Sequence, residues 1–152
     1  MLKLMYITNS PEVASIADGA GVDRIFIDLE QYGKEKRQKN WDSVKSKHSI
    51  SDIPKVKSAV KNAQIFVRTD PIFDGFSDEL EGVLACEPDV VMLPYFKTVR
   101  EVETFIKAVD GRATTSLLLE TREAAEQIDD IISVGGIDEI HIGLSLIHIS
   151  EP

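Results

Sequence analysis

Six short apolar segments, rich in β-branched residues, recur along this chain and alternate with stretches of helical character. They cover residues 2–8, 24–29, 64–69, 90–95, 115–119 and 139–144. Five of them are almost continuously apolar, which is typical of parallel strands buried on both faces. The first is less regular because Lys3 interrupts it. The pattern predicts a parallel sheet covered by helices.

Each gap between these segments can hold a helix. Five helices are predicted, opened by polar residues at positions 9–10, 51–52, 77–79, 98 and 121. The first has Pro11 in its opening turn and reaches about Gly19, and the last stops at Gly135-Gly136. A strand–helix alternation of this kind predicts right-handed crossover connections throughout.

Two folds share this alternation. A doubly wound sheet of about five or six strands would be complete in a chain of this size. A (β/α)8 barrel normally needs about 250 residues, so 152 residues can supply only about six of its eight units. Length favours the doubly wound sheet, whereas the residues at the strand ends favour the barrel.

Composition excludes several classes of protein. Hydrophobic residues make up 43% and charged residues 28%, as in an ordinary globular domain and unlike a disordered chain. The net charge of -9 and the pI of about 4.8 argue against a nucleic-acid partner. The absence of an apolar run of about 18 residues and of a signal peptide predicts no membrane partner and a cytoplasmic location. Cys86 is predicted to be a small core residue.

Polar side chains follow the predicted strands at the point where each strand ends. The second strand ends in Asp28-Leu29-Glu30, and the spacing of two places both carboxylates on one face. The third ends near Arg68 and the fifth near Glu120. Because the carboxyl ends of parallel strands meet at one rim, these groups indicate a site for a hard divalent cation and an anionic substrate.

A simpler explanation competes with this one, because an acidic residue after a strand is more often a helix cap or a solvated side chain. Capping accounts well for Asp70 and Thr121, whereas for Asp28 it competes evenly with a functional role. It accounts less well for Glu120, because the adjacent Thr121 is the better cap.

Five segments in register resemble the HpcH/HpaI aldolase and citrate lyase β-subunit superfamily. They are residues 21–30 (GVDRIFIDLE), 67–68 (VR), 91–94 (VMLP), 118–121 (LLET) and 137–144 (IDEIHIGL). The resemblance implies a parallel (β/α)8 TIM-type barrel, incomplete here, over residues 1–144. It also implies a carbon–carbon lyase that acts on a 2-keto acid or an acyl thioester through an enolate. Mg²⁺ or Mn²⁺ is the implied cofactor, and the full-length protein is expected to be a homo-oligomer.

The same resemblance implies roles for individual residues. Arg68 corresponds to the arginine that holds the substrate carboxylate or keto oxygen, a role that suits a permanently charged, bidentate guanidinium. Glu120 corresponds to a metal-ligand carboxylate. Glu30 corresponds to the acidic residue of an Asp-x-Glu motif, a catalytic position at which it would hold metal-bound water or position a base. Asp28 supports the site from behind the residues that contact the substrate. Pro94 is assigned to substrate binding.

Two departures from the family pattern concern proton transfer and the metal. Gln31 occupies the position at which the aldolase branch carries a proton-transferring histidine, and Gln31 cannot titrate. Tyr32, Lys34 and His48 are the nearby candidates, although His48 is read more simply as a solvated loop residue.

The second departure is at the end of the chain. Residues 145–152 form an atypical tail in place of the family's Asn-Asp-Leu, so one expected metal ligand is absent. The tail is interpreted either as sequence foreign to the family or as a sixth strand that continues through Ile149. We also expect an exposed strand edge and exposed apolar surface where barrel units are missing.

Three further features of the sequence concern the neighbourhood of this site. Residues 34–48 are locally basic, which suits either a solvated loop or an anion site, and Trp41 is expected to pack this loop down. His141 is expected to point into the barrel as a supporting or core residue.

For the whole chain, a non-catalytic barrel that binds an anion and a doubly wound nucleotide-binding domain stay as alternatives, although no glycine-rich fingerprint follows any strand.

Overall fold

Strands and helices alternate along the whole described part of the chain. The structure, a computed structural model, describes residues 2–31 and 47–143. The elements in these ranges are β1 (Met5–Ile7), α1 (Pro11–Gly19), β2 (Arg24–Asp28), α3 (Asp52–Ala59), β3 (Gln64–Arg68), α4 (Phe76–Leu84), β4 (Val90–Leu93), α5 (Val99–Val109), β5 (Thr114–Leu119), α6 (Arg122–Glu126), α7 (Ile128–Ser133) and β6 (Glu139–Ile142). No helix among these is long and apolar enough to cross a membrane.

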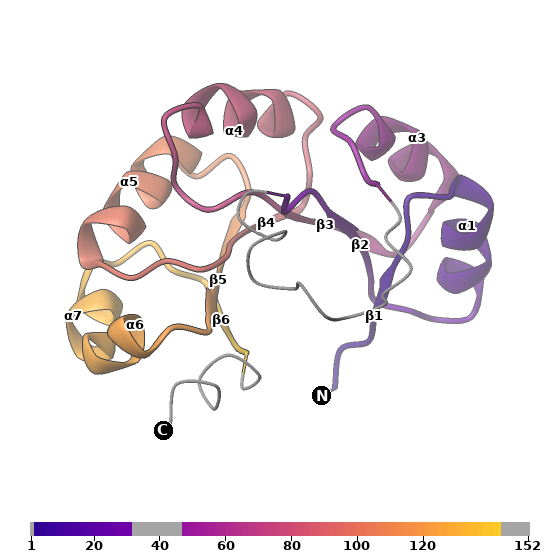
Figure 1. The fold of residues 1–152 in the computed structure, drawn as a ribbon. Coiled ribbons are helices and arrows are strands. Elements are labelled where there is room, and N and C mark those ends of the chain that lie inside the picture. Colours follow the sequence, from indigo (N-terminus) through magenta and orange to yellow (C-terminus); the bar gives the residue numbers. More distant parts are fainter. Residues whose placement is uncertain (1, 32–46, 144–152) are drawn as a thin grey trace, which may run out of the picture.

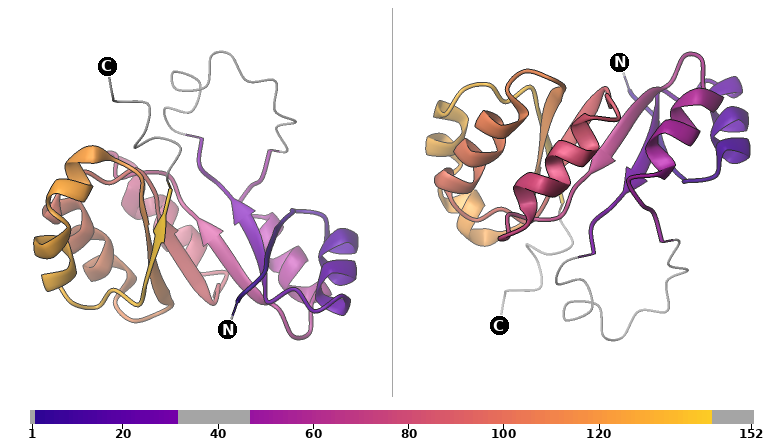
Figure 2. Two further views of the ribbon diagram at one scale, coloured as in Figure 1. Left: turned by 90° about the horizontal axis from the view of Figure 1, so that it is seen from below. Right: turned by 90° about the horizontal axis from the view of Figure 1, so that it is seen from above.

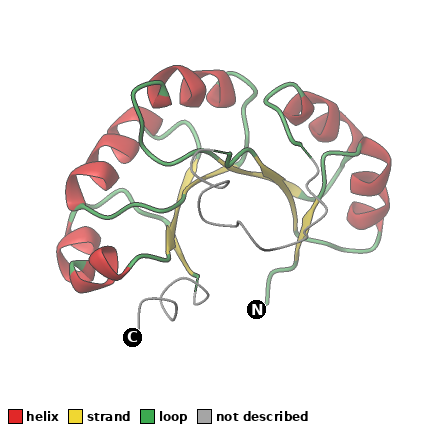
Figure 3. Ribbon diagram, in the orientation of Figure 1, coloured by secondary structure: helices red, strands yellow, loops and turns green. Residues whose placement is uncertain are grey.

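The strands form one parallel sheet in the order β1-β2-β3-β4-β5-β6. A doubly wound sheet reverses its strand order at a switch point, and this sheet does not, so the doubly wound alternative is wrong. The sheet curls into an open arc with the helices on its convex side (Figures 1 and 3). Views from below and above show the strands tilted within this arc (Figure 2). The chain therefore forms an incomplete parallel β/α barrel, as the sequence predicts.

Side chains alternate between the two faces of the sheet, and each face has its own core. The larger core lies between the sheet and the helices and includes Ile25 and Ile27 of β2. The smaller core lies on the concave face. It consists of Phe26, Phe66, Val90 and Met92, with the partly buried Leu118 packed against it. The rings of Phe26 and Phe66 meet edge to face, with centroids 5.0 Å apart. Burial on both faces explains why these strands are continuously apolar.

Most of the predicted helix starts are confirmed. Ser10 caps α1, with Pro11 at its first position. Thr98 and Glu101 form a capping box at the start of α5, because each side chain accepts the backbone N–H of the other residue. Thr121 caps α6 by accepting the N–H of Ala124.

Two helices differ from the prediction. α4 begins at Phe76 with Gly75 as its N-cap, and not at Ser77. The helix predicted after β5 is divided at Gln127, whose backbone is not helical. The Gln127 side chain donates hydrogen bonds to the carbonyl oxygens of Lys97 and Glu123, at 3.0 and 2.9 Å. These bonds join α6 to the segment before α5, a tertiary contact that a helical pattern in the sequence does not contain.

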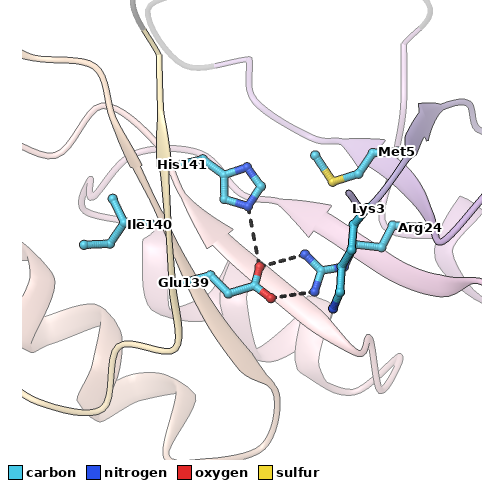
Figure 4. A pocket seen from close by; sticks show the side chains of 6 residues that line it. All are labelled: Lys3, Met5, Arg24, Glu139, Ile140 and His141. Atoms are coloured by element: carbon cyan, nitrogen blue, oxygen red, sulfur yellow. Dashed lines mark hydrogen bonds and ion pairs between the residues drawn. The ribbon is translucent and has the colours of Figure 1, made fainter. Parts of the chain in front are cut away.

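One ion pair crosses the concave side of the sheet. Arg24 of β2 donates to both carboxylate oxygens of Glu139 on β6, at 2.7 and 2.6 Å (Figure 4). Its Nε also donates to Gln64 at 3.1 Å. The Arg24 hydrogen bond is the chief cause that lowers the pKa of Glu139, against the opposing effect of burial. Lys3, Met5 and His141 border the hollow beside this pair.

The two edge strands expose apolar side chains, as expected for an open barrel. Tyr6 and Ile7 on β1 are 48% and 55% exposed, and Ile142 on β6 is 65% exposed. His141 points to the concave side, as predicted: its ring centroid lies 5.6 Å from that of Phe66 and its Nε2 lies 3.5 Å from Glu139.

The Arg24–Glu139 pair is expected to contribute more to stability than an exposed pair of the same geometry. Glu139→Gln should lower the free energy of unfolding by about 1–3 kcal/mol, because it leaves the guanidinium of Arg24, 5% exposed, without its counter-ion. Glu81→Gln is the matched control. Glu81 also binds an arginine through both oxygens, but the two side chains of that pair are 59% and 43% exposed, and its loss should cost less than about 1 kcal/mol. Urea unfolding of both variants measures the difference, and equal losses would contradict the prediction.

Candidate active site

Arg68 and Asp28 face each other at the carboxyl ends of two neighbouring strands. They are register partners in the pairing of β2 with β3. The guanidinium donates from Nε and Nη2 to the two oxygens of Asp28, at 3.0 and 2.8 Å. It also lies over the ring of Phe26, with Cζ 5.5 Å from the centroid. Pairing, hydrogen bonds and stacking together fix the plane of the guanidinium.

Glu30 joins this pair from the segment that follows β2. Its Oε2 lies 3.3 Å from Nη2 of Arg68, and only 7% of the side chain is exposed. Its backbone N–H donates to Oδ1 of Asp28 at 3.2 Å. The structure thus brings together Asp28, Glu30 and Arg68, which the sequence analysis placed at one rim.

Glu120 approaches the same group from the end of β5. It is 8% exposed, and its Oε1 accepts the backbone N–H of Tyr95 at 3.0 Å. Burial lowers the pKa of Arg68, but the hydrogen bonds and charge of Asp28 and the charges of Glu30 and Glu120 outweigh it and raise that pKa. The carboxylate at the end of β5 therefore acts on the guanidinium at the end of β3.

Pro94 and Tyr95 connect β4 to this site. Pro94 is buried, and Tyr95 follows it in the left-handed region, with φ of 50°. This conformation is strained for a residue with a Cβ. It directs the Tyr95 N–H to Glu120, while Lys97 lies over the Tyr95 ring, 5.4 Å from its centroid. Strain at this position is therefore coupled to the placement of Glu120.

His48 is buried, with 3% exposure, so its interpretation as a solvated loop residue is wrong. Its Nδ1 accepts the backbone N–H of Asp28 at 2.9 Å. That contact anchors the end of β2 and leaves Nδ1 without a proton. The other candidates for proton transfer, Tyr32 and Lys34, lie outside the described residues.

Asp70 is not a helix cap, because Gly75 occupies the N-cap of α4. Its Oδ1 instead accepts the backbone N–H of Gln31 at 2.6 Å. Its own N–H donates to Glu79 Oε1 at 3.1 Å. Glu79 has no role predicted from the sequence, because its position on a helix gives no sign of burial.

Cys86 packs against the larger core and is partly buried, in line with the expectation of a core residue. Its Sγ donates to the carbonyl oxygen of Gly82 at 3.5 Å. Trp41, most of the basic loop at 34–48 and the tail at 145–152 lie outside the described residues.

The side chains at the strand ends offer few ligands to a divalent cation. Within residues 2–31 and 47–143 no group of three metal-ligating side chains is present. Glu120 nevertheless offers a buried carboxylate, and Gly143 lies beside it. A Cβ at Gly143 would lie 3.0 Å from the Glu120 Cβ and 3.6 Å from its Oε2. Mg²⁺ is commonly bound by one or two carboxylates together with water and substrate oxygens. The described residues fit that open arrangement, and they do not fit a closed protein cage.

Fold and site together define an incomplete parallel β/α barrel with an arginine and three carboxylates at the carboxyl ends of its strands. The sequence model of the HpcH/HpaI aldolase/citrate lyase family matches residues 3–145. The chain belongs to this family. A comparison with curated protein sequences found no match.

Solved structures share the fold at low sequence identity. An HpcH/HpaI aldolase/citrate lyase family protein from Burkholderia cenocepacia J2315 is 12% identical, with a TM-score of 0.76 over 97% of this chain and 65% of that one. An HpcH/HpaI aldolase from Desulfitobacterium hafniense DCB-2 is 15% identical, with a TM-score of 0.67 over 93% and 62%. The citrate synthase SbnG is 17% identical, with a TM-score of 0.68 over 93% and 60%. The chain thus spans less than two thirds of the length of these proteins.

Two substitutions at Tyr95 are expected to separate backbone strain from loss of the ring. Asn tolerates the left-handed region, whereas the β-branched Val does not. Tyr95→Val should therefore lower the free energy of unfolding by about 1–2 kcal/mol more than Tyr95→Asn. Both variants lose the contact with Lys97, so the comparison cancels it. Urea unfolding measures the difference, and equal stabilities would show that the conformation at position 95 imposes no cost.

Proposed function

We propose that this chain carries the carboxylate- and enolate-binding part of a carbon–carbon lyase that acts on a 2-keto acid or an acyl thioester. Membership of the aldolase/citrate lyase family supports the reaction class. The observation that carries the proposal is the position of Arg68, which is fixed by Asp28 and Glu30 and lies within the field of Glu120.

Arg68 binds and orients the substrate. Its Nε and Nη2 are occupied by Asp28 and Glu30. In the part of the chain that the structure describes, Nη1 makes no hydrogen bond, so its two N–H groups are available to a substrate oxygen. A guanidinium held in this way is positioned before the substrate arrives, so it stabilises negative charge that develops on a keto oxygen as the carbon–carbon bond breaks. Pro94, which is buried at the end of β4, is proposed to form an apolar boundary of the substrate site.

The other carboxylates divide the remaining tasks. Glu120 is the residue that would hold Mg²⁺ or Mn²⁺, and the cation would act as a Lewis acid that polarises the substrate carbonyl. Glu30 is nearly excluded from water and lies 3.3 Å from Arg68. It is the proposed catalytic residue that positions a proton-transferring base beside the substrate. Asp28 acts behind Arg68, because both of its oxygens bind the guanidinium.

A non-catalytic barrel that binds a small anion is the second candidate. Gln31 cannot take up or release a proton in place of a histidine, and Nδ1 of His48 is already engaged by the backbone of Asp28. Both functions place an anion on Arg68, so they differ only in whether bond cleavage follows. For the full-length protein we propose a small anionic substrate and a homo-oligomeric state.

Arg68→Lys is expected to weaken binding of oxalate, a planar dicarboxylate that resembles the enolate of pyruvate. Lysine keeps the charge but loses the planar, two-point contact. A charge-assisted hydrogen bond contributes about 1.5–3 kcal/mol, so the Kd for oxalate measured by calorimetry with Mg²⁺ should rise about tenfold or more. Arg122→Lys, on the exposed face of α6, is the control and should leave the Kd unchanged. An unchanged Kd in Arg68→Lys would remove Arg68 from the site.

Glu120→Gln is expected to reduce the affinity for Mn²⁺ at least about tenfold, because the amide keeps the shape of the side chain but removes the anionic ligand. Electron paramagnetic resonance of free Mn²⁺ measures this without any turnover. Glu123→Gln is the matched control, since Glu123 lies three residues further on and binds the exposed Lys97. Equal Mn²⁺ affinity in Glu120→Gln and the wild type would contradict a metal site at Glu120.

A further inference from the structure

Glu79 is a partly buried carboxyl group that the proposed reaction does not use. It lies in the first turns of α4, and its Oε2 is shielded from solvent without a hydrogen-bond partner among the described residues. A charged carboxylate in that position leaves Oε2 without water and without a donor in its place, which costs free energy. A glutamate on the surface would instead have both carboxylate oxygens hydrated.

Glu79 is connected to the active site through two hydrogen bonds. Its Oε1 accepts the backbone N–H of Asp70 at 3.1 Å. The carboxylate of Asp70 accepts the backbone N–H of Gln31 at 2.6 Å. Gln31 is the residue after Glu30, whose side chain lies 3.3 Å from Arg68. The path therefore runs from α4, through the segment after β3, to the segment after β2.

We propose that Glu79 is a positioning residue that fixes Glu30 against Arg68 through Asp70 and Gln31. The expected effect on ligand binding rests on the proposed function. The chain of hydrogen bonds from Glu79 through Asp70 to Gln31, called the relay below, is a property of the fold alone. Glu79 acts as the neutral acid, because an anionic Glu79 would add a second charge beside Asp70 and would strand its buried oxygen.

The charges around Glu79 agree with this assignment. The pKa of Glu79 is raised to about 7, chiefly by burial. The hydrogen bond from the Asp70 backbone lowers this pKa, and the negative charge of Asp70 raises it further. Asp70 faces Glu79 from the segment before α4. On α4 itself, Asp78 is exposed and Glu81 is bound to Arg112. The pKa of Glu79 is raised above its unfolded value, so the neutral form persists in the folded protein at pH 6 and is lost as the pH rises through about 7.

The first arm of the test measures the pH dependence of oxalate binding with Mg²⁺. Between pH 6 and 8 the wild type should lose between about twofold and tenfold in affinity, since one proton can change an equilibrium by at most about tenfold per pH unit. Glu79→Gln, a permanently neutral isostere, should remove this loss of affinity between pH 6 and 8. Asp78→Asn, on the same helical turn, should keep the wild-type profile. A Glu79→Gln profile identical to that of the wild type would overturn the proposal.

The second arm does not depend on ligand binding. Amide hydrogen exchange of Gln31, measured by NMR at pH 6.5, should be at least about fivefold faster in Glu79→Ala than in the wild type, because a loosened hydrogen bond lowers local protection. Glu79→Gln should restore the protection, and Asp78→Asn should not alter it. Unchanged exchange in Glu79→Ala would overturn the relay. Absence of oxalate binding in every variant, with exchange as predicted, would instead overturn the proposed function and leave the relay supported.

Discussion

The ion pair between Arg24 and Glu139 joins two strands that are not neighbours in the sheet. Three strands lie between β2 and β6, so their side chains meet only because the sheet is strongly curled. Arg24 is almost fully buried, and its counter-ion must therefore stay in place. The pair is the contact that most directly requires the barrel curvature, and the placement of the strand ends depends on that curvature.

The curvature explains why residues far apart in the sequence meet at one mouth. Arg68 ends β3, Asp28 ends β2 in the adjacent register position, and Glu120 follows β5. In a flat sheet, β5 would lie two strand spacings, or about 10 Å, from β3. In the curled sheet the charge of Glu120 contributes to the raised pKa of Arg68. An arginine surrounded by carboxylates in this way stays charged at any physiological pH and can serve as a fixed electrostatic element.

The sequence predicted those features that depend on local pattern. Apolar runs located the six strands, although Lys3 interrupts the first of them. Thr98 with Glu101 located the start of α5 through an exchange of hydrogen bonds between residues three positions apart. The rim positions of Asp28, Glu30, Arg68 and Glu120 followed from the rule that parallel strands end on one side.

The features that the sequence did not predict depend on contacts between distant segments. Gln127 leaves the helix because its side chain binds a carbonyl group 30 residues earlier. His48 is buried and Oε2 of Glu79 is shielded from solvent, although both residues look like surface residues by type. The pairing of Arg24 with Glu139 spans 115 residues, and neither residue stands out within its own strand.

The most direct test of the account is whether a cation at Glu120 lies close to the guanidinium of Arg68. Mn²⁺ broadens nuclear resonances near its binding site, and the arginine Nε–H signals can be observed in protein labelled with ¹⁵N-arginine. Substoichiometric Mn²⁺ should broaden the Arg68 signal and leave those of Arg112 and Arg122 sharp, and Glu120→Gln should abolish the effect. A bound Mn²⁺ that leaves Arg68 sharp would contradict the convergence of the two strand ends on one site.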